Sequence, residues 1–421
     1  MNKEKKKVQV LEVKLDKTLV GYLAGYADGK NLFTFAHEYI EMGLKRPTLT
    51  LNYYNQSDEN IFREPIVTNF KLHPIFSNLL PEKELKKLAA QRLKIADDNE
   101  LEMLIGLGRD LPGSIVIRKL TKKEIPPYAL EGAVEIEKIE PVLEVNDEEF
   151  SLAGIMMKFS MYEENGIHRM SKRDHLGNWI VKTPSITHKH VPLNEFTAMK
   201  LAEAVGISIP EIKIIKMNDI IGLPDIKFGD EEYAFAIKRF DRNKKYRIHS
   251  EDFAQIIERH PKDKYGKYNY ATLANIIKNK FPNPINELNE FFARLVVNLM
   301  IGNGDAHLKN WSVVYFDKIN PKLSDAYDIV FTRAYTTTDN SIAFNIGGEK
   351  ETSKLEIAHF KRMAENIELD WKLIERRISN TIKDAKEKWP KLLIELPMHD
   401  SQKEKMREYW KSLKPDFRID S

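Results

Sequence analysis

The chain has 421 residues, 42% of them hydrophobic and 31% charged, which is enough for two or three folded units with substantial cores. Its formal net charge of +3 gives no global argument for binding nucleic acid or a membrane surface, and the lack of cysteine excludes disulfides, thiol nucleophiles and cysteine-ligated metal sites. No run approaches the roughly 18 consecutive apolar residues of a membrane helix, and no signal-peptide core follows the N-terminal lysines. We therefore expect a cytoplasmic protein that does not enter a membrane.

Residues 1–115 predict a small mixed unit of strands and helices. Asp16 and Lys17 form a turn signal between two extended runs, which predicts a hairpin. After Pro81, apolar residues recur at helical spacing between lysines and glutamates. The strands expected in this unit are 8–15, 19–26 and 114–120, and the helical segments are 85–93 and 101–107. A stretch rich in Pro, Glu and Lys follows from 121 to 150 and indicates a connector.

The segment from 151 to 240 is rich in predicted strands. One helix, 193–205, interrupts them and ends at Gly206, a residue type that favours helix C-termini. The strands expected in this segment are 155–161, 167–171, 179–183, 212–217 and 233–240.

From residue 250 onward the pattern is mainly helical. The longest apolar helix is expected at 288–301, and two or three amphipathic helices are expected between 355 and 413. A sheet-rich half followed by a helical half predicts two lobes with a cleft between them, an outline that many folds share.

A short segment after the longest helix carries the residues most typical of a catalytic site. Asp305 and Asn310 are separated by four residues, the spacing of the kinase catalytic loop, in which the aspartate accepts the proton of the substrate hydroxyl and the asparagine holds magnesium. Asp328 supplies the second carboxylate that a magnesium–phosphate site requires, although Asp325 lies close enough in sequence to be an alternative. Taken alone, Asp and Asn at such a spacing are more typical of ordinary turns.

Two charged residues upstream change this balance. Lys182 lies in an apolar strand, like the kinase lysine that grips the nucleotide phosphates, and Glu195 opens the next helix, where a kinase places the partner of that lysine. An edge-strand lysine and a first-turn glutamate are the ordinary explanations of each residue by itself. The order of phosphate lysine, helix glutamate, Asp-x4-Asn loop and metal aspartate is what favours a kinase.

Two further features have simpler interpretations, and a third departs from the usual kinase pattern. His307 is expected to pack within the catalytic loop rather than bind a metal, because magnesium prefers oxygen ligands. Tyr265, Tyr268 and Tyr270 alternate with lysines, and a solvated face explains them better than stacking on nucleic acid. The region of the phosphate loop contains a single glycine, Gly154, instead of the three of a usual kinase glycine-rich loop.

Together these segments resemble the HipA family of bacterial toxin kinases, most closely over 150–331. The specific signature is Asp-Ala-His-Leu-Lys-Asn at 305–310 with Tyr-Asp-Ile at 327–329. Lys238 stands where the family has glutamate, and two methionines at 156–157 replace a polar pair. Weaker matches to the family are Ser-Leu-Ala-Gly at 151–154, Lys158, Trp-Ile-Val-Lys at 179–182, Asn-Glu at 194–195, Lys-Arg-Phe-Asp-Arg at 238–242 and the helix motif Glu-Asp-Phe-Ala-Gln at 251–255.

The resemblance implies an α+β, protein-kinase-like fold of two lobes, with an extra small N-terminal subdomain. The implied divisions are residues 1–115 for that subdomain, 116–240 for the N-lobe with its phosphate loop and hinge, and 241–421 for a helical C-lobe with the catalytic loop and metal site. Adenine would lie at the hinge, against the backbone at Lys238 and Phe240.

The resemblance also implies an ATP- and magnesium-dependent serine/threonine-protein kinase. Asp305 would be its catalytic base, and Asn310 and Asp328 would be its magnesium ligands. The implied ATP-binding residues are Ser151, Leu152, Ala153, Gly154, Lys182, Lys238, Phe240 and His307, with Glu195 and Gln255 in support.

Regulation and partners follow from the same resemblance. Ser151 would be open to autophosphorylation, and a phosphate of about −1.5 to −2 charges there would repel the ATP phosphates. The implied partners are a HipB-like helix-turn-helix antitoxin, DNA reached only through that antitoxin, and a protein substrate, by resemblance an aminoacyl-tRNA synthetase. Two alternatives stay open: a weakly active or inactive module that mainly binds the antitoxin in a DNA-bound repressor complex, and a metal-dependent phosphohydrolase using Asp305, His307 and Asp328.

Overall fold

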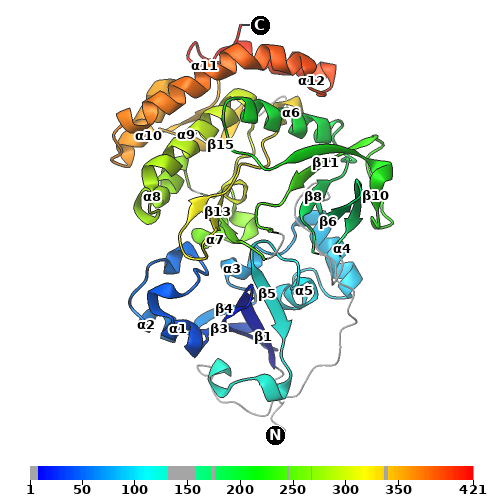
Figure 1. The fold of residues 1–421 in the computed structure, drawn as a ribbon, viewed down its shortest axis with the longest axis vertical. Helices are drawn as coiled ribbons and strands as arrows, with labels where there is room; N and C mark the ends of the chain where they lie inside the picture. Colours follow the sequence, from blue (N-terminus) through cyan, green and yellow to red (C-terminus); the bar gives the residue numbers. More distant parts are fainter. Residues whose placement is uncertain are drawn as a thin grey trace.

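The computed structural model describes residues 8–130, 158–171, 176–243, 246–266, 268–335 and 340–420. A sheet of the N-terminal unit lies at one end of the molecule, and helices α11 (Lys372–Glu395) and α12 (Asp400–Ser412) lie at the opposite end (Figure 1). None of the helices in the described ranges combines the length and the apolar character needed to cross a membrane.

The N-terminal unit is built on an antiparallel five-stranded sheet. Its strands are β1 (Val8–Leu15), β2 (Thr18–Tyr26), β3 (Lys30–Phe35), β4 (Ile66–Asn69) and β5 (Ile115–Lys119), in the order β4-β3-β2-β1-β5. Asp16, with φ of +53°, makes the tight turn between β1 and β2, so the predicted hairpin is confirmed. The helices of this unit are α1 (His37–Glu41), α2 (Asn60–Arg63), α3 (Pro74–Ser77), α4 (Lys83–Leu93) and α5 (Glu100–Leu107).

A second sheet of six strands follows. Its strands are β6 (Lys158–Glu164), β7 (Ile167–Met170), β8 (Trp179–Lys182), β9 (Ile212–Lys216), β10 (Ile220–Ile221) and β11 (Tyr233–Lys238), in the order β10-β7-β6-β8-β11-β9. Helix α6 (Val191–Ala204) contacts β9 and β11, and the chain leaves it at Gly206, whose φ of +75° suits glycine at a helix end. The predicted helix and the strands expected here are confirmed, except that residues 155–157 of the first strand lie outside the described residues.

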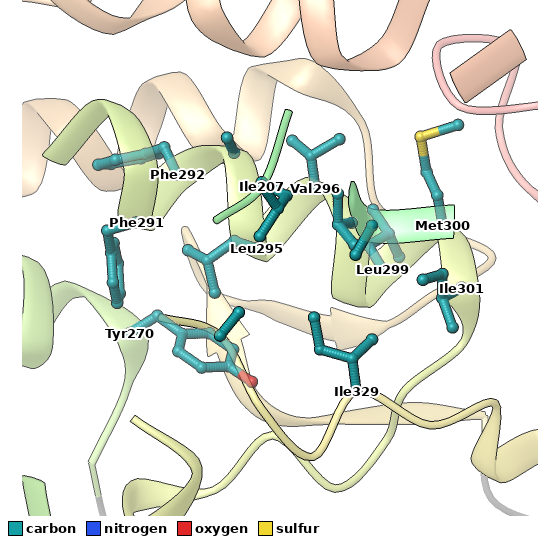
Figure 2. Packing of buried hydrophobic residues seen from close by; sticks show 14 of the residues in the cluster. Ile207, Tyr270, Phe291, Phe292, Leu295, Val296, Leu299, Met300, Ile301 and Ile329 are labelled. Atoms are coloured by element: carbon teal, nitrogen blue, oxygen red, sulfur yellow. The ribbon is translucent and has the colours of Figure 1, made fainter. Parts of the chain in front are cut away.

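The helical half surrounds one central helix. This is α9 (Pro284–Ile301), which starts with a proline in its first turn, where the missing N–H costs nothing, and is followed by Gly302 at φ of +79°. Figure 2 shows side chains of α9, among them Phe291, Leu295 and Leu299, packed near Tyr270 and Ile329. The other helices of this half are α7 (Phe253–Ile256), α8 (Tyr270–Lys280) and α10 (Ile357–Asn366), together with α11 and α12.

Short strands interrupt the helical half. They are β12 (His249–Asp252), β13 (Ser312–Tyr315), β14 (Lys322–Leu323), β15 (Ser341–Ile346) and β16 (Glu349–Glu351), with β13 central in a three-stranded sheet and β15 paired with β16. The expectation of one helix at 251–255 is therefore wrong in its first two residues, because Glu251 and Asp252 pair with β13 about sixty residues away. Single turns of 3₁₀ helix complete the description: Gly43–Lys45, Leu51–Tyr53, Lys122–Glu124, Pro127–Leu130, Met217–Asp219, Pro261–Asp263, Leu308–Asn310 and Thr332–Ala334.

The buried apolar side chains form two clusters. One cluster joins α6, α8, α9 and the C-terminal helices. The other joins the N-terminal sheet to the six-stranded sheet, through residues such as Phe159, Trp179 and Val181. The two sheets thus share one buried core, which fixes the N-terminal unit against the second sheet. The divisions at residues 115 and 240 stay predictions.

One buried carboxyl group makes the stability of this arrangement depend on pH. Glu251 accepts hydrogen bonds from Thr50 Oγ1 (2.7 Å), Leu51 N (2.7 Å) and the Tyr315 hydroxyl, and so links the N-terminal unit to the three-stranded sheet. Burial raises the pKa of Glu251 from its ordinary 4.5 to about 7, against the lowering effect of these donors. The folded state therefore retains the Glu251 proton at pH values where the unfolded chain has lost it.

We expect the free energies of unfolding of the wild type and of Glu251→Gln to differ by an amount that depends on pH. Because the pKa of Glu251 is raised in the folded state, the proton on this group adds to the free energy of unfolding. This stabilisation is fully present below about pH 4.5 and is lost as the pH rises through about 7. The free energy of unfolding of the wild type, minus that of the variant, should fall by about 3 kcal/mol between about pH 4 and about pH 8. Urea unfolding at the two pH values measures it. A constant difference would show that Glu251 titrates normally.

Candidate active site

A cavity of about 490 Å³ lies where the six-stranded sheet, the catalytic-loop segment and the N-terminal unit meet. This volume is in the usual range for small-molecule sites. Residues 151–154, expected to form the phosphate loop and to include the phosphorylated Ser151, lie outside the described residues, as do Met156 and Met157. The cavity brings together these residues predicted from the sequence: Lys158, Lys182, Lys238, Phe240, Gln255, Asp305, His307, Asn310 and Asp328.

Two neighbouring strands direct two lysines at one carboxylate. Lys158 in β6 and Lys182 in β8 are direct partners across an antiparallel pair. Lys158 Nζ lies 2.8 Å from Asp328 Oδ2, and Lys182 forms an ion pair with Asp328 Oδ1. Lys182 also forms an ion pair with Glu195 from α6, behind the cavity wall. The pairing of Lys182 with Glu195 that the sequence predicted is therefore present in the structure.

Two of these charged groups, Lys182 and Glu195, are almost entirely removed from water, whereas the Lys158 and Asp328 side chains keep 18% and 19% exposure. Lys182 is 2% exposed and Glu195 is 0% exposed. Burial acts to lower the pKa of Lys182, but Asp328 and Glu195 outweigh it and leave that pKa raised, so the lysine is charged. Burial acts to raise the pKa of Asp328, but Lys158 and Lys182 outweigh it and hold that pKa well below its usual range. For Glu195 burial prevails and raises the pKa.

Asp328 is held in a backbone conformation that few non-glycine residues adopt. Its φ is +55°, in the left-handed region, and such positions tend to cluster at functional sites. Asn303 Nδ2 donates to the Asp328 carbonyl (3.3 Å). Asn194 of α6 exchanges two hydrogen bonds with the backbone of Phe331, at 3.1 and 2.9 Å. The alternative carboxylate, Asp325, does not line the cavity and accepts a hydrogen bond from Ser208 Oγ (2.6 Å).

The end of α9 places Asp305 beside this charge cluster. The Asp305 backbone N–H donates to Asn303 Oδ1 (3.1 Å), so the same asparagine holds both aspartates. Asn310 Nδ2 donates to the Asp305 carbonyl (2.8 Å), which orients the amide of the predicted metal ligand. The Tyr265 hydroxyl donates to Asp305 Oδ1. Asp305 is thus fixed through its backbone, and its carboxylate is within reach of a hydroxyl group.

His307 lies in the same loop and packs within it, as expected. The backbone N–H of His307 donates to the Asp305 carbonyl (2.7 Å). The imidazole ring meets the Tyr265 ring edge to face, with centroids 5.0 Å apart. Burial lowers the pKa of His307 to about 4, despite the opposite effect of Asp305. The imidazole is therefore neutral near pH 7. Its expected contact with ATP stays a prediction.

The hinge after β11 is fastened to the N-terminal unit by buried ion pairs. Arg239 donates to both carboxylate oxygens of Asp241 (2.9 and 2.8 Å) and to Asp110 Oδ1 (3.2 Å). Arg242 donates to the same Asp110 oxygen (2.9 Å). Lys238 and Phe240, the expected adenine contacts, line the cavity beside this network. No local sequence signal indicates Asp110, the partner that these two arginines share in the N-terminal unit.

A second link from the N-terminal unit reaches the catalytic loop. Glu82 pairs with Lys264 (2.8 Å) and lies 3.4 Å from Lys309, which also donates to the Asn78 carbonyl (3.0 Å). Gln255, the predicted supporting residue, donates to the Ile75 carbonyl (2.8 Å).

No local sequence pattern indicates the ion pairs of Glu82 with Lys264 and Lys309, because the partners lie up to about 230 residues apart. The expectation of a solvated face around the tyrosines is wrong for Lys264 and Tyr270, both of which are buried in the structure. The neighbouring apolar packing and the Glu82 ion pair take these two side chains out of the solvent.

The oxygen atoms of Asn310 and Asp328 suit magnesium. Carboxylate and amide oxygens are the hard ligands that this ion prefers, and it commonly takes its remaining ligands from phosphates and water. Within the described ranges, no group of three or more His, Asp and Glu side chains is placed to hold a metal ion. Asn310 and Asp328 could thus supply part of the oxygen ligands of a magnesium ion, with phosphates and water supplying the rest.

Comparisons with known proteins cover almost the whole chain. The family described as the HipA-like C-terminal domain matches residues 150–389, and the HipA N-terminal domain matches residues 11–118. The chain is 34% identical over 403 residues to the Sinorhizobium fredii protein named "Putative kinase Y4dM", covering 93% of this chain and 94% of that protein. It is 20% identical over 375 residues to the serine/threonine-protein kinase toxin HipA of Shewanella oneidensis, covering 82% of each.

The fold has a solved counterpart. The structure of the HipA, HipB and operator DNA complex of the Shewanella oneidensis toxin–antitoxin system contains a chain that matches with a TM-score of 0.71 and 19% identity. The match covers 96% of this chain and 95% of that one. The predicted α+β, kinase-like fold is confirmed.

Proposed function

The chain belongs to the HipA family, and on this premise we propose that it is a toxin kinase that transfers the γ-phosphate of ATP to a serine or threonine of a protein. The observation that carries the proposal is the convergence of Asp305, Asn310, Asp328 and Lys182 on one cavity, from three separate segments of the chain. These are the parts that phosphoryl transfer requires: a base for the hydroxyl, oxygen ligands for magnesium and a cation for the phosphates.

Each residue has a role that follows from its contacts. Asp305 accepts the proton of the acceptor hydroxyl, since its carboxylate already receives a hydrogen bond from one. Asn310 and Asp328 would hold magnesium, which when bound neutralises negative charge on the phosphates. Lys182, charged and buried, provides positive charge for the phosphate oxygens, and Glu195 holds it in position. Lys158 adds a second cation at the same place.

The hinge residues Lys238 and Phe240 would contact adenine through their backbone. The Lys238 N–H donates to the Glu211 carbonyl (2.9 Å), so we assign the adenine contact at this residue to its carbonyl oxygen. Phe240 would supply a backbone N–H, and its ring packs 5.6 Å from that of Tyr327. Glutamate in place of Lys238 would present the same backbone group. The phosphate loop at 151–154 and autophosphorylation of Ser151 belong to the proposal as well.

The partners are proposed on the family relationship. The related Shewanella protein forms a complex with HipB and operator DNA, which supports a HipB-like helix-turn-helix antitoxin for this chain and contact with DNA through it. An aminoacyl-tRNA synthetase is the proposed substrate, and the cytoplasm is where both partners would be met.

Replacing the two neighbouring aspartates separately tests the magnesium assignment. We expect Asp328→Asn to lower the rate of phosphate transfer by about a hundredfold or more, because it removes a charged metal ligand. Asp325→Asn should stay within about twofold of the wild type, since its carboxylate bonds Ser208 outside the cavity. Transfer from labelled ATP, measured against magnesium concentration, gives both rates. Equal losses in the two variants would contradict the assignment.

The wild-type chain in the same assay distinguishes a protein kinase from a module that mainly binds an antitoxin. Label on protein supports the kinase. ATP binding without any transfer, together with tight binding of a helix-turn-helix antitoxin, would instead support a module that acts mainly by binding its partner. Phosphatase treatment before the assay removes phosphate already on the chain.

A further inference from the structure

A tyrosine side chain lies at the carboxylate of the proposed catalytic base. The Tyr265 hydroxyl donates a hydrogen bond to Asp305 Oδ1. A general base must lie within hydrogen-bond reach of the hydroxyl whose proton it takes, and this contact meets that condition. The hydroxyl that the proposed kinase needs at Asp305 is thus provided by the chain itself, at a residue to which the proposed function assigns no role.

Several contacts besides this hydrogen bond hold the tyrosine in place. Its ring meets the buried His307 ring edge to face, at an interplanar angle of 79°. The preceding residue, Lys264, is 7% exposed and pairs with Glu82 of the N-terminal unit at 2.8 Å. The Leu308 N–H of the catalytic loop donates to the Lys264 carbonyl (3.4 Å). Tyr265 is therefore anchored from both the catalytic loop and the N-terminal unit.

The charge state and exposure of Tyr265 suit an acceptor. Burial, and then the Asp305 carboxylate, raise the pKa of the Tyr265 hydroxyl above its ordinary value of 10.0. The phenol therefore keeps its proton near pH 7 and depends on a base to lose it. The residue as a whole is 50% exposed, so there is open space beside it for a phosphate group.

We propose that Tyr265 is a phosphorylation site that this chain modifies itself, with a nucleoside triphosphate as donor and Asp305 as base. The inference rests on the proposed kinase function. The Tyr265 oxygen forms a bond to the γ-phosphorus while the bond from that phosphorus to the β,γ-bridging oxygen breaks. The phenol proton passes to Asp305, and the nucleoside diphosphate leaves with the electron pair of the broken bond.

Phosphate at this position would stop further transfer. A phosphotyrosine brings about −1.5 to −2 charges beside Asp305 and occupies the place where another acceptor hydroxyl has to bind. Both effects act where an acceptor hydroxyl meets Asp305 and not on the proposed phosphate contacts Lys158 and Lys182, so the modified chain should still bind ATP while its transfer to other proteins falls.

Mass-spectrometric mapping of the full-length chain tests the site. The protein is treated with a phosphatase, freed of it, and incubated with magnesium and ATP. We expect phosphate on Tyr265 in the wild type, and its rate of appearance should fall by about a hundredfold or more in Asp305→Asn. Tyr268→Phe is the matched control: its hydroxyl accepts from Arg259 and not from the site, so phosphorylation of Tyr265 should persist at the wild-type level. Melting temperatures show whether each variant is folded.

Two measurements decide whether transfer occurs within one chain. The rate per molecule should stay constant over a hundredfold dilution of the protein. In a mixture of Asp305→Asn and Tyr265→Phe chains, Tyr265 of the first variant should remain unmodified. Phosphate on it in the mixture would overturn the intrachain geometry.

The result separates this inference from the proposed function. Phosphate on serine or threonine but never on Tyr265 would overturn the inference and leave the kinase standing. No phosphate on any residue, and no transfer to another protein, would remove the kinase function and the inference with it.

Discussion

Replacing Asp305 with asparagine is expected to lower the rate of phosphate transfer by about a hundredfold to ten-thousandfold, the usual contribution of a general base. Asparagine has the same shape but cannot take up the proton of the acceptor hydroxyl. The loop should keep its conformation, because Asn303 and Asn310 hold position 305 through its backbone N–H and carbonyl. Initial rates with labelled ATP and magnesium measure the effect.

ATP binding separates loss of chemistry from loss of the site. We expect Asp305→Asn to bind ATP within about threefold of the wild type by calorimetry, since the proposed phosphate contacts come from Lys182 and Lys158. A variant that transfers phosphate at more than half of the wild-type rate would exclude Asp305 as the base.

Replacing Lys182 with methionine should damage both activity and stability. Methionine has a similar length and no charge, so the nucleotide phosphates lose a buried cation, and the transfer rate should fall by about a hundredfold to a thousandfold. The variant also leaves Glu195 buried without its ion-pair partner, and breaking a buried pair from one side costs about 3 to 5 kcal/mol. Urea unfolding and transfer assays measure the two losses.

A second substitution can separate these effects. In Lys182→Met combined with Glu195→Gln, no uncompensated charge stays buried at this position, so stability should recover in large part while phosphate transfer stays low. Lys216→Met is the control, because that lysine lies on an exposed surface and its Nζ is 3.6 Å from Glu232; it should match the wild type in both assays. Recovery of transfer in the double variant would show that Lys182 acts only through stability.

Local sequence patterns predicted the elements whose partners are close along the chain. The hairpin around Asp16 was predicted because its two strands follow one another, and the helix ended by Gly206 because helical spacing and a glycine stop are both local signals. Strand β12 was missed because its partner β13 lies about sixty residues further on. Nothing in a four-residue stretch reveals such a partner.

For the candidate site, too, one part was predictable from local sequence and another part required the structure. The types and spacing of Lys182, Glu195, Asp305 and Asn310 predicted phosphoryl-transfer chemistry, because each role requires a particular functional group. The choice of Asp328 over the nearby Asp325 required the structure, which places only the first of them against two lysines in the cavity.

The sequence by itself determined the family, the fold class and most of the side chains proposed to act on ATP, since motif and periodicity are properties of neighbouring residues. Only the tertiary structure decided how they are held. The links from Asp110 and Glu82 to the hinge and the catalytic loop, and the contact of Tyr265 with Asp305, join segments that are 40 to more than 200 residues apart. Such contacts form where buried charges and hydroxyls find partners as the chain folds, and that pairing depends on distance in space.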